Sequence, residues 1–167
     1  MAACRRAAAA LLGGVPPERV ILTSGATHAL NLAILGMAGR AGSAVTSVNE
    51  HNSVLRPLFA AARRCGTQVQ VIGLGPDGAL DREAFNGALD RRPGLVAISH
   101  ASNVTGRVND VEPLFRAARA VGAVTLLDAS QSVGHLLVHP TELASDMVAF
   151  PAHKALMGQA GVGVLYV

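Results

Sequence analysis

Aromatic side chains are scarce in this sequence, whose 167 residues include four phenylalanines, one tyrosine and no tryptophan. Proteins that bind single-stranded nucleic acid stack bases on exposed aromatic rings within a basic groove. Here the formal net charge of +3 comes from scattered arginines, and no basic run is interleaved with aromatic residues. We therefore assign the positive charge to a solvated surface and expect no nucleic-acid partner.

Long apolar runs and clustered cysteines are also missing. No stretch reaches the roughly 20 apolar residues that a membrane-spanning helix needs, so we expect no membrane partner. The N-terminal apolar run ends at Gly13 and Gly14 without a convincing signal-peptide cleavage site, which favours a helix. Cys4 and Cys65 are isolated and lack metal-ligand spacing, a pattern typical of reduced thiols in a cytoplasmic protein.

Lysine is almost absent, because Lys154 is the only lysine among the 14 lysine and arginine residues. Arginine is always protonated, whereas burial can tune a lysine to a neutral amine that forms a Schiff base. Lys154 follows the apolar run 147–150 and precedes a glycine-rich turn, an unusual place for a solubilising charge. A codon bias toward arginine is the alternative explanation, and Lys154 alone does not decide between the two.

The apolar residues that are present, 50% of the chain, predict an α/β fold with one domain over residues 1–167. Strand-like and helical segments alternate about six times. We expect strands at 19–23, 44–48, 68–72, 95–99, 123–127 and 147–150, and helices that end near residues 12, 37, 64, 89 and 121. The strands lack alternation between apolar and polar positions, which indicates a mainly parallel sheet with helices on both faces.

Polar residues follow five of these expected strands, one after another. In an open parallel sheet, ligands bind at the carboxyl ends of the strands. Because surface loops are polar anyway, a single residue of this kind would mean little, but five strand ends together predict a binding site. The residues are Thr27, His51, Asn103, Asp128, Gln131 and Lys154.

Two of these strand ends have local alternatives. Residues 24–27, Ser-Gly-Ala-Thr, match an anion cradle made from a glycine and free amides at a helix start, but an ordinary N-cap is the better interpretation of this motif alone. Asp128 ends an apolar strand, so its charge needs a cation or a donor nearby. Capping of a helix that begins at Ala129 is the alternative role for Asp128.

A metal site and a dinucleotide site are both disfavoured. His135 and His139 are separated by apolar residues and followed by Pro140, which indicates an extended segment that holds the imidazoles too far apart for one ion. The glycines at 158–163 precede a strand instead of opening a helix, unlike a dinucleotide fingerprint. We therefore expect neither group.

Five motifs resemble the class V aminotransferases, and most closely their cysteine desulfurase and selenocysteine lyase branch. The resemblance covers essentially the whole chain in the right order. It implies the large pyridoxal phosphate (PLP)-binding domain of a fold type I enzyme, with the small C-terminal domain absent. The motifs lie at 23–31, 49–51, 98–106, 127–131 and 152–154, the last followed by Gly158, Gly161 and Gly163.

The resemblance also implies roles for three catalytic residues. Lys154 would be the Schiff-base lysine and the base that moves the substrate alpha proton. Asp128 would keep the pyridinium nitrogen of PLP protonated, so that the ring works as an electron sink. His51 would stack on the ring.

Further cofactor contacts are implied by the same resemblance. Ala26, Thr27 and His153 would bind the PLP phosphate, and Gln131 would donate to the phenolic oxygen. Asn103 would lie near the substrate carboxylate or the ring oxygen.

Two departures from the family pattern limit these expectations. Pro151 stands where the family usually has a serine or threonine hydroxyl for the phosphate. The family's C-terminal domain, with its substrate-binding arginine and sulfur-accepting cysteine, would lie beyond Val167, and neither Cys4 nor Cys65 inherits that cysteine's role. We therefore expect a homodimer, or a partner that supplies the C-terminal half, and no desulfurase turnover by this chain alone.

The predicted function is PLP-dependent cleavage of a carbon–sulfur bond in a small amino acid. Within the same family, transamination and selenocysteine lysis stay open as alternatives. A non-catalytic remnant or binding module that retains the fold is the alternative from another class.

Overall fold

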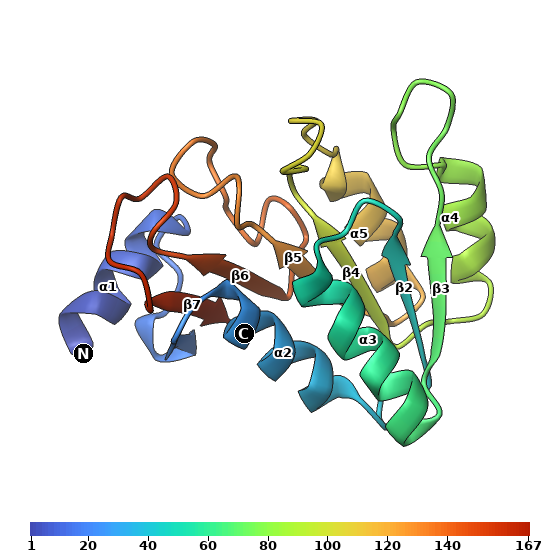
Figure 1. The fold of residues 1–167 in the computed structure, drawn as a ribbon, viewed down its shortest axis with the longest axis horizontal. Helices are drawn as coiled ribbons and strands as arrows, with labels where there is room; N and C mark the ends of the chain where they lie inside the picture. The colour runs from blue at the N-terminus through green and yellow to red at the C-terminus, as the bar shows by residue number, and fades with distance from the viewer.

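The computed structural model describes residues 1–167 as a seven-stranded sheet covered by five helices (Figure 1). The helices are α1 (Ala2–Leu11), α2 (Ala26–Met37), α3 (Asn52–Cys65), α4 (Arg82–Leu89) and α5 (Val111–Ala120), with a short 3-10 helix, η1 (Pro17–Arg19). The strands are β1 (Val20–Thr23), β2 (Ser43–Ser47), β3 (Gln68–Ile72), β4 (Leu95–Ser99), β5 (Val124–Asp128), β6 (Met147–Pro151) and β7 (Gly163–Tyr166).

The sheet is mainly parallel, as the sequence predicts. Its strand order is β1-β7-β6-β5-β4-β2-β3. Strands β6, β5, β4, β2 and β3 pair in parallel, and β7 pairs antiparallel with both β6 and β1. Because β7 is the single reversed strand, the carboxyl ends of the other six lie at one edge.

Two apolar cores cover the two faces of the sheet. Strand β4 contributes Leu95 and Ala97 to the core formed with α2 and α3. Its alternate residues Val96 and Ile98 enter the core formed with α1, α4 and α5. Figure 1 shows α2 and α3 side by side on one face. Helices on both faces therefore explain why β4 is buried at every position.

Local capping sets where two of the helices begin and end. Asp81 accepts a hydrogen bond from the amide of Ala84 at the start of α4. Helix α3 begins after His51, whose side chain accepts from the amide of Ser53, and ends at Gly66 in the left-handed conformation. None of the helices is long and apolar enough to cross a membrane.

The connection from β5 to β6 differs from the sequence-based expectations. Residues 129–146 consist of turns and irregular segments without a helix, so the alternation of strand and helix breaks here. Asp128 does accept a hydrogen bond from the amide of Ser130, but it caps a turn and not a helix. His135 itself lies in a turn, its amide donating to the Ser132 carbonyl, whereas residues 137–139, which separate it from Pro140, belong to no helix or turn.

Candidate active site

A cavity of about 660 Å³ lies at the carboxyl ends of the strands and is lined by 17 residues. This volume is within the range of small-molecule and cofactor sites, about 300–1,000 Å³. All eight residues singled out from the sequence line it: Ala26, Thr27, His51, Asn103, Asp128, Gln131, His153 and Lys154. The edge of the sheet thus brings together side chains that are up to 128 positions apart, from Ala26 to Lys154.

One wall of the cavity is the N-terminus of α2. Its N-cap is Gly25, with φ 143° and ψ 173°, a conformation open essentially only to glycine. The N-cap expected within residues 24–27 is therefore Gly25, and no side chain makes a capping hydrogen bond here. The first amides of a helix have no carbonyl partner within it. Since Gly25, Ala26 and Thr27 line the cavity, this wall is suited to bind an anion.

A chain of hydrogen bonds links that wall to the imidazole of His51. The Thr27 Oγ1 atom lies 2.8 Å from Ser53 Oγ, which lies 2.9 Å from His51 Nδ1. The amide of Ser53 also donates to this Nδ1, at 3.1 Å. Sequence reasoning missed Ser53, because a serine in the first turn of a helix is a common residue and only the fold places it against α2.

Asp128, at the floor of the cavity, is only 5% exposed. Burial raises the pKa of its carboxyl group, while the hydrogen bonds from Ser130 and the nearby charges of Lys154 and His51 act in the opposite direction. Asp128 forms no salt bridge. A cationic or proton-donating group of a ligand in the cavity would therefore stabilise the carboxylate.

Glu50 is a second buried carboxyl group, directly beneath the site. Its Oε1 accepts from Ser47 Oγ at 2.7 Å and from the Ser99 amide at 2.9 Å, and its Oε2 accepts from Ser99 Oγ at 2.6 Å. Burial, with a smaller contribution from the charge of Asp128, raises the pKa of Glu50 to about 7 despite these donors. Sequence reasoning passed over Glu50 in favour of its neighbour His51, although a glutamate one turn after a buried strand was an available signal.

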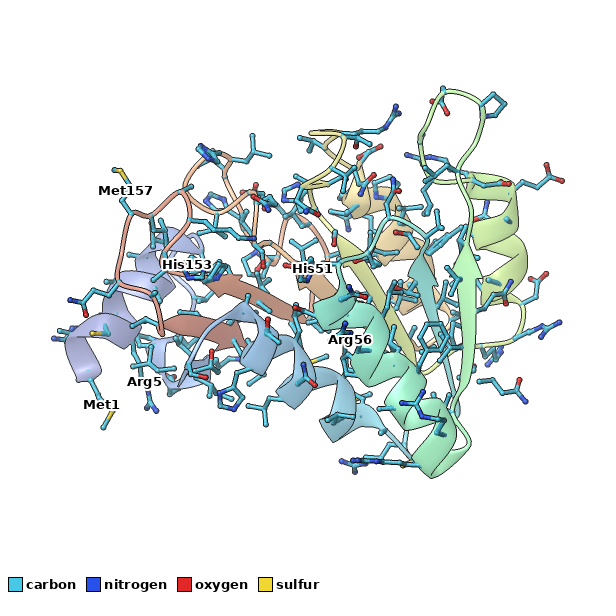
Figure 2. The ribbon with its side chains drawn as sticks, in the orientation of Figure 1. Met1, Arg5, His51, Arg56, His153 and Met157 are labelled. Carbon is cyan, nitrogen blue, oxygen red and sulfur yellow. The ribbon has the colours of Figure 1, made fainter.

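The remaining predicted residues lie on loops at the open side of the cavity. Figure 2 shows His51 and His153 along the carboxyl edge of the sheet. His153 and Lys154 are exposed, and the side chain of Lys154 forms no hydrogen bond or salt bridge. Asn103 is an exposed residue of the loop after β4, and Gln131 is half-buried in the turn after β5.

The structure does not gather a set of metal ligands around His135 and His139. His139 Nδ1 lies 3.1 Å from Glu142 Oε1, and no group of three or more His, Cys, Asp or Glu side chains could hold an ion. Pro151, at the end of β6, lines the cavity beside His153.

Known proteins resemble the chain over its full length. The family model described as aminotransferase class-V matches residues 1–167. A cysteine desulfurase of Pectobacterium carotovorum is 36% identical, over 99% of this chain and 42% of that protein. A probable cysteine desulfurase of Mycobacterium leprae is 40% identical, over 92% of this chain and 38% of that protein.

Solved structures give the same result for the fold. The cysteine desulfurase CsdA from Escherichia coli superimposes with a TM-score of 0.92 at 28% identity, over 98% of this chain and 42% of that one. The apo cysteine desulfurase from Thermococcus onnurineus gives 0.89 at 34% identity, over 98% and 41%. The chain thus spans about 40% of the length of the relatives that it matches.

Proposed function

The chain belongs to the class V aminotransferase family, and from that premise we propose that its cavity binds PLP for cysteine-desulfurase-like cleavage of a carbon–sulfur bond in a small amino acid. The observation that carries this proposal is the content of the cavity: an uncapped helix N-terminus, a buried carboxylate and the only lysine of the chain. These groups fit the phosphate, the ring nitrogen and the aldehyde of PLP, respectively.

The phosphate would bind at the wall formed by α2. The Thr27 hydroxyl, the amide of Ala26 and the His153 imidazole would donate to its oxygens. At this wall Pro151 offers neither a hydroxyl nor an amide donor, which weakens the site compared with a serine or threonine.

Bound PLP supplies an electron sink for bond cleavage at the substrate alpha carbon. The Asp128 carboxylate would hold the proton on the ring nitrogen, and His51 would pack on the ring and orient it. Gln131 would donate to the phenolic oxygen. Lys154 would hold the cofactor through its amine and take the proton from the substrate alpha carbon.

Residues 1–167 offer no sulfur acceptor at the cavity. Cys4 and Cys65 are free thiols, and neither lines the site. Because the chain spans about 40% of its relatives' length, we propose turnover only for a site completed by residues outside 1–167, on the same polypeptide, a second copy or a partner. For residues 1–167 themselves, the proposed activity is to bind PLP and to attach it covalently to the Lys154 amine.

Titration with PLP followed by borohydride reduction tests this proposal. Because Lys154 is the only lysine, reduction should add one cofactor mass per chain, and the peptide that contains Lys154 should carry it. Lys154→Arg, which keeps the charge but cannot form the bond, is the matched control and should remain unlabelled. A label on the N-terminal amine alone, or none on the wild-type chain, would reject the proposal.

A further inference from the structure

Ser53 is a buried residue without an assigned role in PLP chemistry, and its hydroxyl contacts two residues of the cavity. It is 7% exposed and lies in the first turn of α3. Its Oγ is 2.8 Å from Thr27 Oγ1 on α2 and 2.9 Å from His51 Nδ1 at the end of the loop after β2. One hydroxyl therefore bridges the anion-binding wall and the imidazole.

The backbone of Ser53 limits where the His51 proton can be. Its amide donates to His51 Nδ1 at 3.1 Å, so Nδ1 presents a lone pair. In the neutral imidazole the proton must then be on Nε2, the nitrogen that is not engaged by α3. The Ser53 hydroxyl, 2.9 Å from the same Nδ1, can donate to it and reinforce this tautomer.

The Ser53 hydroxyl has only one proton to donate. Without an anion, Ser53 donates this proton to His51, and the Ser53 oxygen accepts a hydrogen bond from the Thr27 hydroxyl. When Thr27 donates to a bound phosphate group instead, Thr27 Oγ1 becomes an acceptor, and Ser53 can donate to it. Occupation of the wall thus changes the hydrogen bonding at His51 through a single rotatable hydroxyl.

We propose that Ser53 is a positioning residue that fixes the Nε2–H tautomer of His51 and couples this imidazole to the anion-binding wall through Thr27. The identity of the anion as the PLP phosphate rests on the proposed function. The coupling itself is a property of the chain without cofactor, and inorganic phosphate can probe it.

Nitrogen-15 spectra of the histidine rings test the tautomer directly. They would be recorded on the cofactor-free chain at about pH 8, above the ordinary imidazole range, because Asp128, His28, His153 and Lys154 line the same cavity. We expect the His51 signals of a dominant Nε2–H tautomer in the wild type. In Ser53→Ala the backbone amide still donates to Nδ1 and keeps this tautomer, so we expect a shift of the Nδ1 signal alone, because its second donor is lost. Ser53→Thr, which keeps the hydroxyl, should restore the wild-type signals.

Inorganic phosphate tests the coupling in the same samples. Phosphate should shift the His51 Nδ1 signal in the wild type but not in Ser53→Ala, and Ser53→Ala should bind phosphate roughly threefold to tenfold more weakly. Asn52→Ala is the matched control, because Asn52 is the exposed neighbour in α3 and makes no hydrogen bond with its side chain. It should behave as the wild type.

Unchanged His51 signals and unchanged phosphate affinity in Ser53→Ala would overturn the inference. If Ser53→Ala loses its circular dichroism, Thr27→Val replaces it and should abolish the phosphate-dependent shift at His51; persistence of the shift would overturn the coupling. Failure of the wild type to bind phosphate would count against the proposed cofactor site and also remove the coupling, whereas the tautomer comparison would still test Ser53.

Discussion

The backbones of Gly163 and Gly25 touch. A Cβ atom added to Gly163 would lie 2.4 Å from the carbonyl carbon of Gly25 and 2.5 Å from its Cα. Gly163 is the first residue of β7 and pairs with Pro151 of β6, so this contact seats the start of α2 against the end of the sheet. The anion-binding wall is thus positioned by two glycines on segments far apart in sequence.

Gly163→Ala should separate α2 from β7. Because the clashing atoms are backbone, neither side can rotate away, and we expect a loss of roughly 2 kcal/mol in the free energy of unfolding. Affinity for inorganic phosphate should fall as well. Chemical denaturation and calorimetry measure the two effects. Gly87→Ala is the control, since Gly87 lies in α4 with no atom within 4 Å of an added Cβ, and it should not lower either quantity.

Pro151→Ser should strengthen PLP binding, because it adds a hydroxyl and an amide donor at the wall that receives the phosphate. One added hydrogen bond to a charged group predicts an affinity about tenfold higher. Absorbance titrations of the wild type, Pro151→Ser and Pro151→Ala give the comparison. Equal affinities for the serine and alanine variants would show that the hydroxyl does not reach the ligand.

Glu50→Gln should flatten the pH dependence of stability. Burial raises the pKa of Glu50 from 4.5 to about 7. Below pH 4.5 this carboxyl is protonated in both the folded and unfolded states, and its raised pKa then contributes fully to the free energy of unfolding. That contribution is lost as pH rises toward and through 7, by about 3 kcal/mol in total.

Denaturation curves between pH 4 and 8 measure this loss as the difference between wild type and Glu50→Gln. The difference removes the opposite contribution of His100, whose pKa is lowered by burial in both proteins. A difference that stays constant across this range would contradict the raised pKa of Glu50.

Asp128→Asn should separate stability from cofactor binding. Burial disfavours the Asp128 charge, and an asparagine can still accept from the Ser130 amide, so the melting temperature of the cofactor-free chain should not fall. PLP affinity should drop by roughly tenfold, since the partner of the ring nitrogen becomes neutral. Glu50→Gln is the control, because it also removes a buried carboxylate but Glu50 does not line the cavity. This variant should keep the wild-type affinity for PLP.

The fold and much of the cavity could be predicted from sequence because both depend on local patterns. Apolar runs such as 95–98 predict a sheet covered on two faces, and the rule that parallel strands end at one edge then brings Asp128 and Lys154 together. The direction of β7 and the turns at 129–146 depend on tertiary contacts that no local pattern encodes. The same holds for Ser53 and Glu50, whose partners Thr27 and Ser99 are 26 and 49 residues away.

The position of β1 has a consequence for how the chain folds. β1 lies at the edge of the sheet and pairs only with β7, Val20 opposite Tyr166, so a strand made early in synthesis waits for the strand of this sheet that is made last. Such a contact between distant residues slows folding. During translation, β1 and the start of α2 remain without their sheet partner until residue 166 has left the ribosome, and the anion-binding wall therefore assembles only after the other strands of this sheet have been made.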